Sequence, residues 1–256
     1  MKAFTLILAC FVLLGFDDGD KNVESRVYAL SGGSADNKND EKKRQVLKGS
    51  TRHCKNFEIV ALPLESGKKA LIGQGFKGHE HLVVVRNGNL NISFENRTKA
   101  MGPGSVAVVL PGDKVELENN ESSTANYFLI KYKSHMPPDN VRGKNSGGSQ
   151  LISWDELEFK PHDKGGVRPY FNRKSAMSER IEMHVTTLNP GIKSHEPHTH
   201  VPGEIIIMME GTTEMEIGDS VYPGTAGDIY FMGSNVPHAI KNTGTEDCMY
   251  MAFQWK

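Results

Sequence analysis

Residues 198–209 read HTHVPGEIIIMM, a polar segment that runs directly into an apolar one. His198 and His200 are two positions apart, so an extended chain points both side chains to one face, and Glu204 has the same parity. The apolar run 205–209 predicts a buried strand, beside which unpaired polar groups would be costly. Two imidazoles and a carboxylate form most of a coordination shell for a divalent transition metal. We therefore predict that a bound metal satisfies this cluster inside a β core.

The overall composition excludes two classes of partner. The 256 residues include 30 Lys and Arg against 31 Asp and Glu, so the formal net charge is −1. This balance indicates neither a nucleic-acid-binding surface nor a polybasic membrane-binding surface. The 26 glycines and the short apolar runs favour many strands joined by tight turns, in one large or two small domains.

Residues 1–20 are predicted to be a signal peptide. Lys2 precedes an apolar stretch, residues 3–16, whose length suits secretion and is short for a membrane span. We therefore expect a secreted or periplasmic protein with no membrane association beyond this export signal. Residues 21–50 are polar and charged, and we expect them to form an arm or linker. In an oxidising compartment, Cys54 and Cys248 could pair or could remain as buried thiols.

The rest of the chain contains an internal repeat with a constant offset. Gly88, Gly104 and Asn119 fall on Gly211, Gly227 and Asn242, each 123 positions further along. Such an offset without gaps indicates a duplicated β domain. The same offset places Gly75, Lys77, His81 and Val115 opposite His198, His200, Glu204 and His238. The first copy therefore keeps the turns and the core but retains at most one plausible metal ligand.

The second copy resembles the cupin superfamily. The first cupin motif runs from a glycine through His-x-His and a glutamate to a second glycine, and the second motif contains a glycine, a histidine and an asparagine. The matching residues are Gly191, His198, His200, Glu204 and Gly211 for the first motif and Gly227, His238 and Asn242 for the second. One extra residue separates Gly191 from His198, and Gly233 and Asn235 stand where the family usually has proline and glycine.

This resemblance implies an all-β fold with two double-stranded β-helix (jelly-roll cupin) barrels in one chain, a bicupin. The N-terminal degenerate barrel would span residues 51–135, the inter-barrel linker 136–178 and the C-terminal metal-binding barrel 179–256. The implied ligands of one divalent transition metal (Mn, Fe, Zn, Ni or Cu) are His198, His200, Glu204 and His238. Four protein ligands leave one or two positions on such an ion for water or substrate.

The layout also resembles the bicupin (S)-ureidoglycine aminohydrolases, although that family has a glutamate and a glutamine where this chain has His198 and His238. We expect a metal-dependent enzyme that acts on a small polar molecule, such as a sugar acid or a ureide-like compound, by hydrolysis, isomerisation or lyase chemistry. A metal-dependent dioxygenase and a non-catalytic cupin that binds a small molecule are the alternatives. Since many bicupins assemble further, a homo-oligomer also agrees with the resemblance.

Two further residues are candidates for catalysis. Arg180, Glu182 and His184 alternate along a predicted strand that leads toward the first motif, so they share one face. We expect this face to point outward, toward solvent. If it points inward, Glu182 and His184 are the candidates for proton transfer or for contact with a polar substrate.

Overall fold

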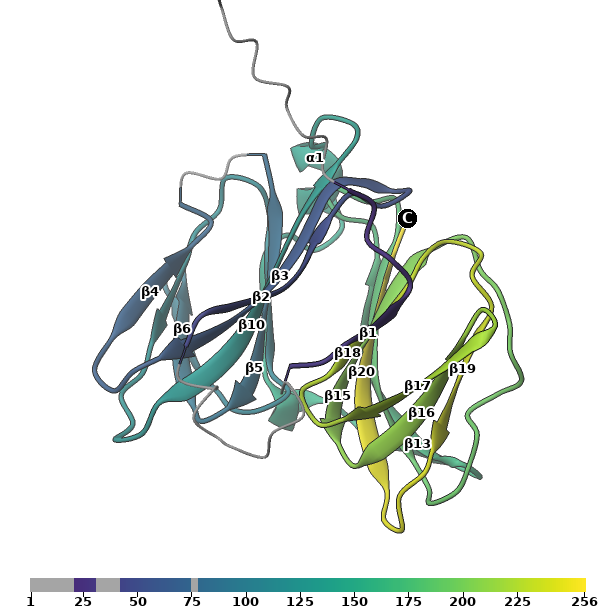
Figure 1. Ribbon diagram of the computed structural model, residues 1–256. Helices are drawn as coiled ribbons and strands as arrows, with labels where there is room; N and C mark the ends of the chain where they lie inside the picture. The colour runs from purple at the N-terminus through teal and green to yellow at the C-terminus, as the bar shows by residue number, and fades with distance from the viewer. Residues whose placement is uncertain (1–20, 31–41, 75–77) are drawn as a thin grey trace, which may run out of the picture.

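The computed structural model describes residues 21–30, 42–74 and 78–256, which fold almost entirely into strands. Figure 1 shows two halves side by side, the N-terminal half in blue to teal and the C-terminal half in green to yellow. Each half contains one large and one small sheet. The predicted signal peptide, residues 1–20, lies outside the described residues. In the part of the chain that the structure describes, no helix is long and apolar enough to span a membrane.

The N-terminal half encloses a core between a six-stranded sheet of order β11-β8-β5-β10-β3-β2 and a four-stranded sheet of order β4-β9-β6-β7. Its strands are β2 (Arg44–Gly49), β3 (Cys54–Leu64), β4 (Lys69–Ile72), β5 (Glu80–Asn87), β6 (Leu90–Phe94), β7 (Arg97–Met101), β8 (Val106–Val109), β9 (Val115–Glu118), β10 (Ala125–Ser134) and β11 (Gln150–Ile152). The short helix α1 (Asn140–Asn145) precedes β11, and the 3-10 turn η2 (Trp154–Glu156) follows it.

The C-terminal half encloses a second core between a seven-stranded sheet of order β1-β18-β15-β20-β14-β13-β12 and a three-stranded sheet of order β17-β16-β19. Its strands are β1 (Arg26–Tyr28), β12 (Lys160–His162), β13 (Gly165–Arg173), β14 (Ile181–Leu188), β15 (Gly203–Glu210), β16 (Thr212–Ile217), β17 (Ser220–Thr225), β18 (Ile229–Met232), β19 (His238–Asn242) and β20 (Cys248–Trp255).

The two halves repeat one topology at the offset that the sequence predicts. The order β8-β5-β10-β3 reappears as β18-β15-β20-β14, and β9-β6-β7 reappears as β19-β16-β17. Strands β5 and β15 begin at Glu80 and Gly203, and β8 and β18 begin at Val106 and Ile229, each pair 123 positions apart. Two copies of one antiparallel two-sheet fold therefore make up the molecule.

The repeat extends to individual hydrogen bonds. Asn119 Nδ2 donates to two backbone carbonyl oxygens at 2.7 and 2.9 Å, and its Oδ1 accepts from the N–H two residues later at 3.0 Å. Asn242 makes the same three contacts at 2.8, 2.9 and 2.9 Å. Both side chains are fully buried. The asparagine at the end of the second motif therefore holds a loop in place.

The two large sheets share a core that contains residues of both halves. Phe57 of β3 stacks on Trp255 of β20, with ring centroids 4.3 Å apart. On β14, the apolar side chains of Ile181, Met183 and Val185 belong to this shared core. Because side chains alternate along a strand, the intervening polar residues of β14 face the interior of the C-terminal half.

The segments predicted as arm and linkers instead contain strands. In the segment 21–50, β1 pairs with β18 of the C-terminal half and β2 pairs with β3 of the N-terminal half. In the segment 136–178, β11 joins the N-terminal sheet, and β12 and β13 join the C-terminal one. These strands lie at or near the edges of the sheets, where half-exposed polar residues are tolerated. Their polar composition therefore does not distinguish them from a linker.

Cys54 and Cys248, which from the sequence could either pair or remain as thiols, are both free thiols in the structure. Cys54 lies in the shared core and Cys248 in the core of the C-terminal half. Both are buried, and neither forms a disulfide.

Candidate metal centre

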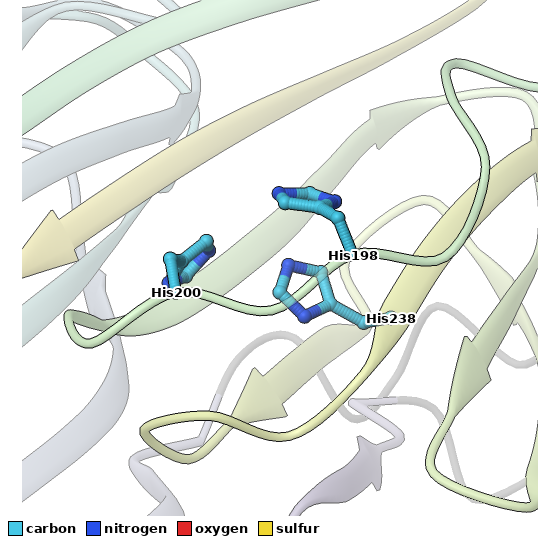
Figure 2. A group of neighbouring side chains, drawn as sticks. All are labelled: His198, His200 and His238. Atoms are coloured by element: carbon cyan, nitrogen blue, oxygen red, sulfur yellow. The ribbon is translucent and has the colours of Figure 1, made fainter.

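Three histidine side chains gather at the start of β15. Figure 2 shows His198 and His200 on the loop that leads into β15, and His238 on a neighbouring strand. The backbones of His198 and His238 form an antiparallel bridge, with N–O distances of 3.2 and 3.1 Å. One ring nitrogen from each histidine lies within 4.8 Å of the other two. The loop and β19 therefore bring together residues that are 40 positions apart in the sequence.

Glu204 completes this cluster from the second position of β15. Its Oε2 lies 2.9 Å from His200 Nε2 and 3.1 Å from His238 Nε2. Burial alone would raise the pKa of the Glu204 carboxyl, but the contacts with His200 and His238 outweigh it and lower the pKa to about 2. The carboxylate is therefore ionised throughout the neutral range, as a metal ligand must be.

Backbone carbonyls fix the tautomers of two of the rings. His200 Nδ1 lies 2.9 Å from the carbonyl oxygen of Pro202, and His238 Nδ1 lies 2.8 Å from that of Val236. A carbonyl oxygen only accepts, so each Nδ1 carries a proton and the Nε2 of each ring faces the Glu204 carboxylate. Contact with Glu204 raises the pKa of His200, so a metal ion would replace the proton that this ring otherwise shares with the carboxylate. The donor set therefore fits a divalent transition metal.

His198 is the most exposed member of the cluster. Partial burial, followed by the neighbouring histidines, lowers its pKa, so the ring is neutral at pH 7 and free to ligate. His195 packs edge-on against it, with ring centroids 4.2 Å apart and the two Nδ1 atoms 3.1 Å apart. His195 thus contacts the cluster from the outer side.

The cluster opens into a cavity of about 300 Å³ inside the C-terminal half. His198, Glu204 and His238 are part of the cavity wall, whereas His200 stands behind Glu204. The remaining lining is mixed apolar and polar, and comprises His162, Lys164, His184, Thr186, Leu188, Ser194, His195, Ile206, Met215, Ile240, Tyr250, Ala252 and Gln254. A small molecule in this cavity would lie directly against the histidines.

The expectation that the face of Glu182 and His184 points outward is wrong. His184 pairs with Ala252, which pairs with Ile206, and all three side chains line the cavity. Burial lowers the pKa of His184, with Glu204 acting in the opposite direction. The reason for the inward orientation is that the other face of β14 is occupied by the shared core.

Glu182 shares this inward face but does not line the cavity. Its carboxylate pairs with the Arg180 guanidinium, and its Oε1 lies 3.6 Å from His184 Nδ1. Of the two catalytic candidates, His184 lines the cavity, whereas Glu182 pairs with Arg180 and lies beside His184.

The N-terminal half lacks the corresponding donor set in its described residues. His81 occupies the position of Glu204 and Val115 that of His238, while residues 75 and 77, opposite His198 and His200, lie outside the described residues. Burial lowers the pKa of His81 to about 4, so its ring is neutral. Within the described ranges, one group of at least three side chains is close enough together to hold a metal ion. It consists of His198, His200 and His238.

The sequence analysis did not predict that His162 and Lys164 line the cavity. His162 ends β12 and Lys164 lies in the turn before β13, inside the segment predicted to be a linker. The available signal was the pair Gly165 and Gly166 after a charged turn, which indicates a hairpin. Nothing in the sequence indicates that this hairpin contributes to the cavity of the second copy.

Comparison with known proteins agrees with this fold. A family model described as a cupin domain matches residues 184–253, which include all four predicted ligands. No curated protein matches the sequence significantly. The chain has the cupin fold, and the sheet order shows that this fold occurs twice.

Solved structures are similar over most of the chain at low sequence identity. Ylba from E. coli is 20% identical, with a TM-score of 0.63, and the match covers 78% of this chain and 77% of that one. The putative glyoxylate induced protein from Pseudomonas aeruginosa is 16% identical, with a TM-score of 0.67 and coverages of 84% and 80%. Oxalate decarboxylase from Bacillus subtilis, which has Mn(II) centres, is 13% identical, with a TM-score of 0.63 and coverages of 93% and 79%.

Proposed function

We propose that the C-terminal half binds one divalent transition metal through His198, His200, Glu204 and His238 and uses it in catalysis on a small polar molecule. The observation that carries this proposal is the convergence of three histidine ring nitrogens and a buried, ionised carboxylate beside a cavity. The metal would polarise a carbonyl or carboxylate of the substrate, or activate a water molecule.

His184 supports a catalytic role over simple capture of a ligand. It lines the cavity together with Glu204, and its lowered pKa leaves the ring neutral at pH 7. A neutral imidazole beside the reacting group can take up a proton and return it later. Glu182, whose Oε1 lies 3.6 Å from His184 Nδ1, would stabilise the ring once it has taken up a proton. A cupin that only binds a ligand needs no such group.

The cavity limits the substrate to a small molecule. A volume of about 300 Å³ lies at the lower end of the range for ligand sites. We favour hydrolysis, isomerisation or lyase chemistry over dioxygenation. Support comes from the similarity to oxalate decarboxylase, whose name describes a non-hydrolytic cleavage of a small carboxylate.

Metal analysis of the purified protein tests the binding claim. We expect about one divalent metal ion per chain in the wild type and loss of that metal in the double variant His198→Ala/His200→Ala. The matched control is His53→Ala, since His53 contacts a backbone carbonyl of the loop but does not belong to the cluster. Equal metal content in wild type and double variant would refute the proposal.

A substrate screen tests the reaction class. Protein reconstituted separately with Mn, Fe, Zn, Ni and Cu is incubated with sugar acids and ureide-like compounds while oxygen consumption is followed. Turnover without oxygen uptake supports the proposed class. Turnover that consumes oxygen would establish the dioxygenase alternative, and ligand binding without turnover by any metal form would establish the binding alternative.

A further inference from the structure

Lys164 is the single lysine among the residues that line the cavity. It lies in the turn between β12 and β13, and its Nζ donates to the carbonyl oxygen of Ser194 at 2.7 Å. Ser194 belongs to the loop that leads to His198. The ammonium group is thus fixed at the cavity wall near the cluster.

The hairpin that carries Lys164 is tightly held. Gly165 has φ +135°, and a Cβ on it would lie 2.2 Å from the carbonyl oxygen of Thr187 on β14. The carbonyl oxygen of Lys164 accepts from Asn189 N at 3.0 Å. The backbone therefore delivers the lysine to the cavity in one defined position, as a recognition residue requires.

Lys164 is also not neutralised. Among the described residues, no carboxylate forms an ion pair with it, whereas nearby Lys193 pairs with Glu216 at 2.8 Å and Glu196 at 3.8 Å. Glu204 is the single carboxylate in the cavity lining, and it is engaged with His200 and His238. The Lys164 ammonium thus lines the cavity without an ion-pair partner among the described residues, and a divalent metal at the cluster would add further positive charge.

We propose, on the basis of the proposed function, that Lys164 binds a carboxylate group of the substrate and makes the cavity selective for small carboxylic acids. A carboxylate accepts charge-assisted hydrogen bonds from an ammonium group and is also a ligand type that transition metals take. One end of a short dicarboxylate or substituted acid would lie on Lys164 while the other faces the histidine cluster. Lys164 is in this sense a specificity-determining residue, separate from the ligands and from His184.

Calorimetric titration with malonate, a small dicarboxylate, tests this role, with the neutral diamide malonamide as the matched ligand. The variant Lys164→Gln keeps a donor for Ser194 but removes the charge. We expect malonate binding to weaken by roughly tenfold to a hundredfold in this variant, while malonamide binding stays the same. Lys164→Arg should retain malonate binding. The control Lys193→Gln removes a charge outside the cavity and should leave malonate binding unchanged.

The outcomes separate this inference from the proposed function. The metal content of each variant is measured on the same samples. If metal-loaded wild type does not bind malonate, if Lys164→Gln binds it as tightly as wild type, or if inorganic phosphate binds more tightly than malonate, the role of Lys164 is refuted while the metal site stands. If the wild type holds no metal but malonate binding still depends on Lys164, the proposed function is refuted and the anion site stands.

Discussion

Individual side chains show how the repeat divides structural from chemical roles. Asn119 and Asn242 have equivalent positions and the same buried hydrogen bonds, so this residue has the same structural role in both copies. His81 and Glu204 also have equivalent positions but different chemistry. The asparagine that secures a loop is thus the same in both copies, whereas the position of the Glu204 carboxylate holds an imidazole in the first copy.

The two asparagines give the first prediction. Replacing either Asn119 or Asn242 by alanine leaves buried carbonyls without donors, and we expect each change to lower the free energy of unfolding by about 2–3 kcal/mol. Urea denaturation measures this. The exposed Asn172→Ala serves as control and should change stability by less than about 0.5 kcal/mol. An Asn242→Ala variant that is as stable as wild type but loses metal would instead make Asn242 part of the site.

A buried carboxylate in the N-terminal half gives a second prediction. Glu80 accepts from Tyr132 Oη at 2.6 Å and from the backbone N–H of Met177 at 3.1 Å, and it is fully buried. Burial raises its pKa above the ordinary value, and these hydrogen bonds offset that only in part. A raised folded-state pKa contributes stability below the unfolded pKa, and that contribution is lost as pH rises through the folded pKa.

Comparison with Glu80→Gln, which does not titrate, isolates this effect. As pH rises from 4 to 8, we expect the free energy of unfolding of the wild type to fall relative to that of the variant. Urea denaturation at several pH values measures the difference. A difference that stays constant with pH would show that the folded pKa of Glu80 is not raised, whatever the fixed cost of the amide.

Among the strands, β14 shows where sequence-based interpretation succeeds and where it stops. Alternation along β14 correctly predicts that Glu182 and His184 share a face, because side-chain parity is local. It cannot predict which face is inward when both faces are enclosed. Here the apolar face meets the other half, so the polar face lines the cavity, against the usual rule that polar residues point to solvent. The metal ligands were easier to predict than the orientation of β14, since all four candidate ligands lie within two sequence motifs.

The hairpin β12–β13 gives a prediction about close backbone contact. In Gly165→Ala, the new Cβ would overlap the carbonyl oxygen of Thr187, so the hairpin must shift away from β14. We expect the free energy of unfolding to fall by about 2 kcal/mol or more. The matched control is Gly191→Ala, which also has positive φ but nothing within 4 Å of the new Cβ. It should cost about 1 kcal/mol, and equal losses in the two variants would contradict the close contact.

For the complete chain, the edge strand β1 links the beginning of the sequence to the second half. Residues 26–28 pair with residues 229–231 at the margin of the seven-stranded sheet. All four residues of β18 are buried. Without β1, the backbone groups of this apolar strand would be open to pairing with another molecule.

Truncation tests this protection. A protein that begins at residue 42 lacks β1, and we expect it to be less stable than one that begins at residue 21 and to self-associate. Light scattering and thermal unfolding measure both effects. A protein starting at residue 42 that stays as monodisperse and as stable as the longer form would show that β18 needs no cover.

The position of β1 also determines how the protein can be divided. The first described strand, β1, belongs to the C-terminal sheet, the strands β2–β11 then build the N-terminal half, and the chain returns to the C-terminal half with β12. A gene split after residue 157 would therefore not yield two self-contained barrels, because the first polypeptide would carry a strand that belongs to the second. The fragments would recognise each other by strand donation as well as through their common apolar face, so the second fragment alone should remain incomplete until the first is supplied.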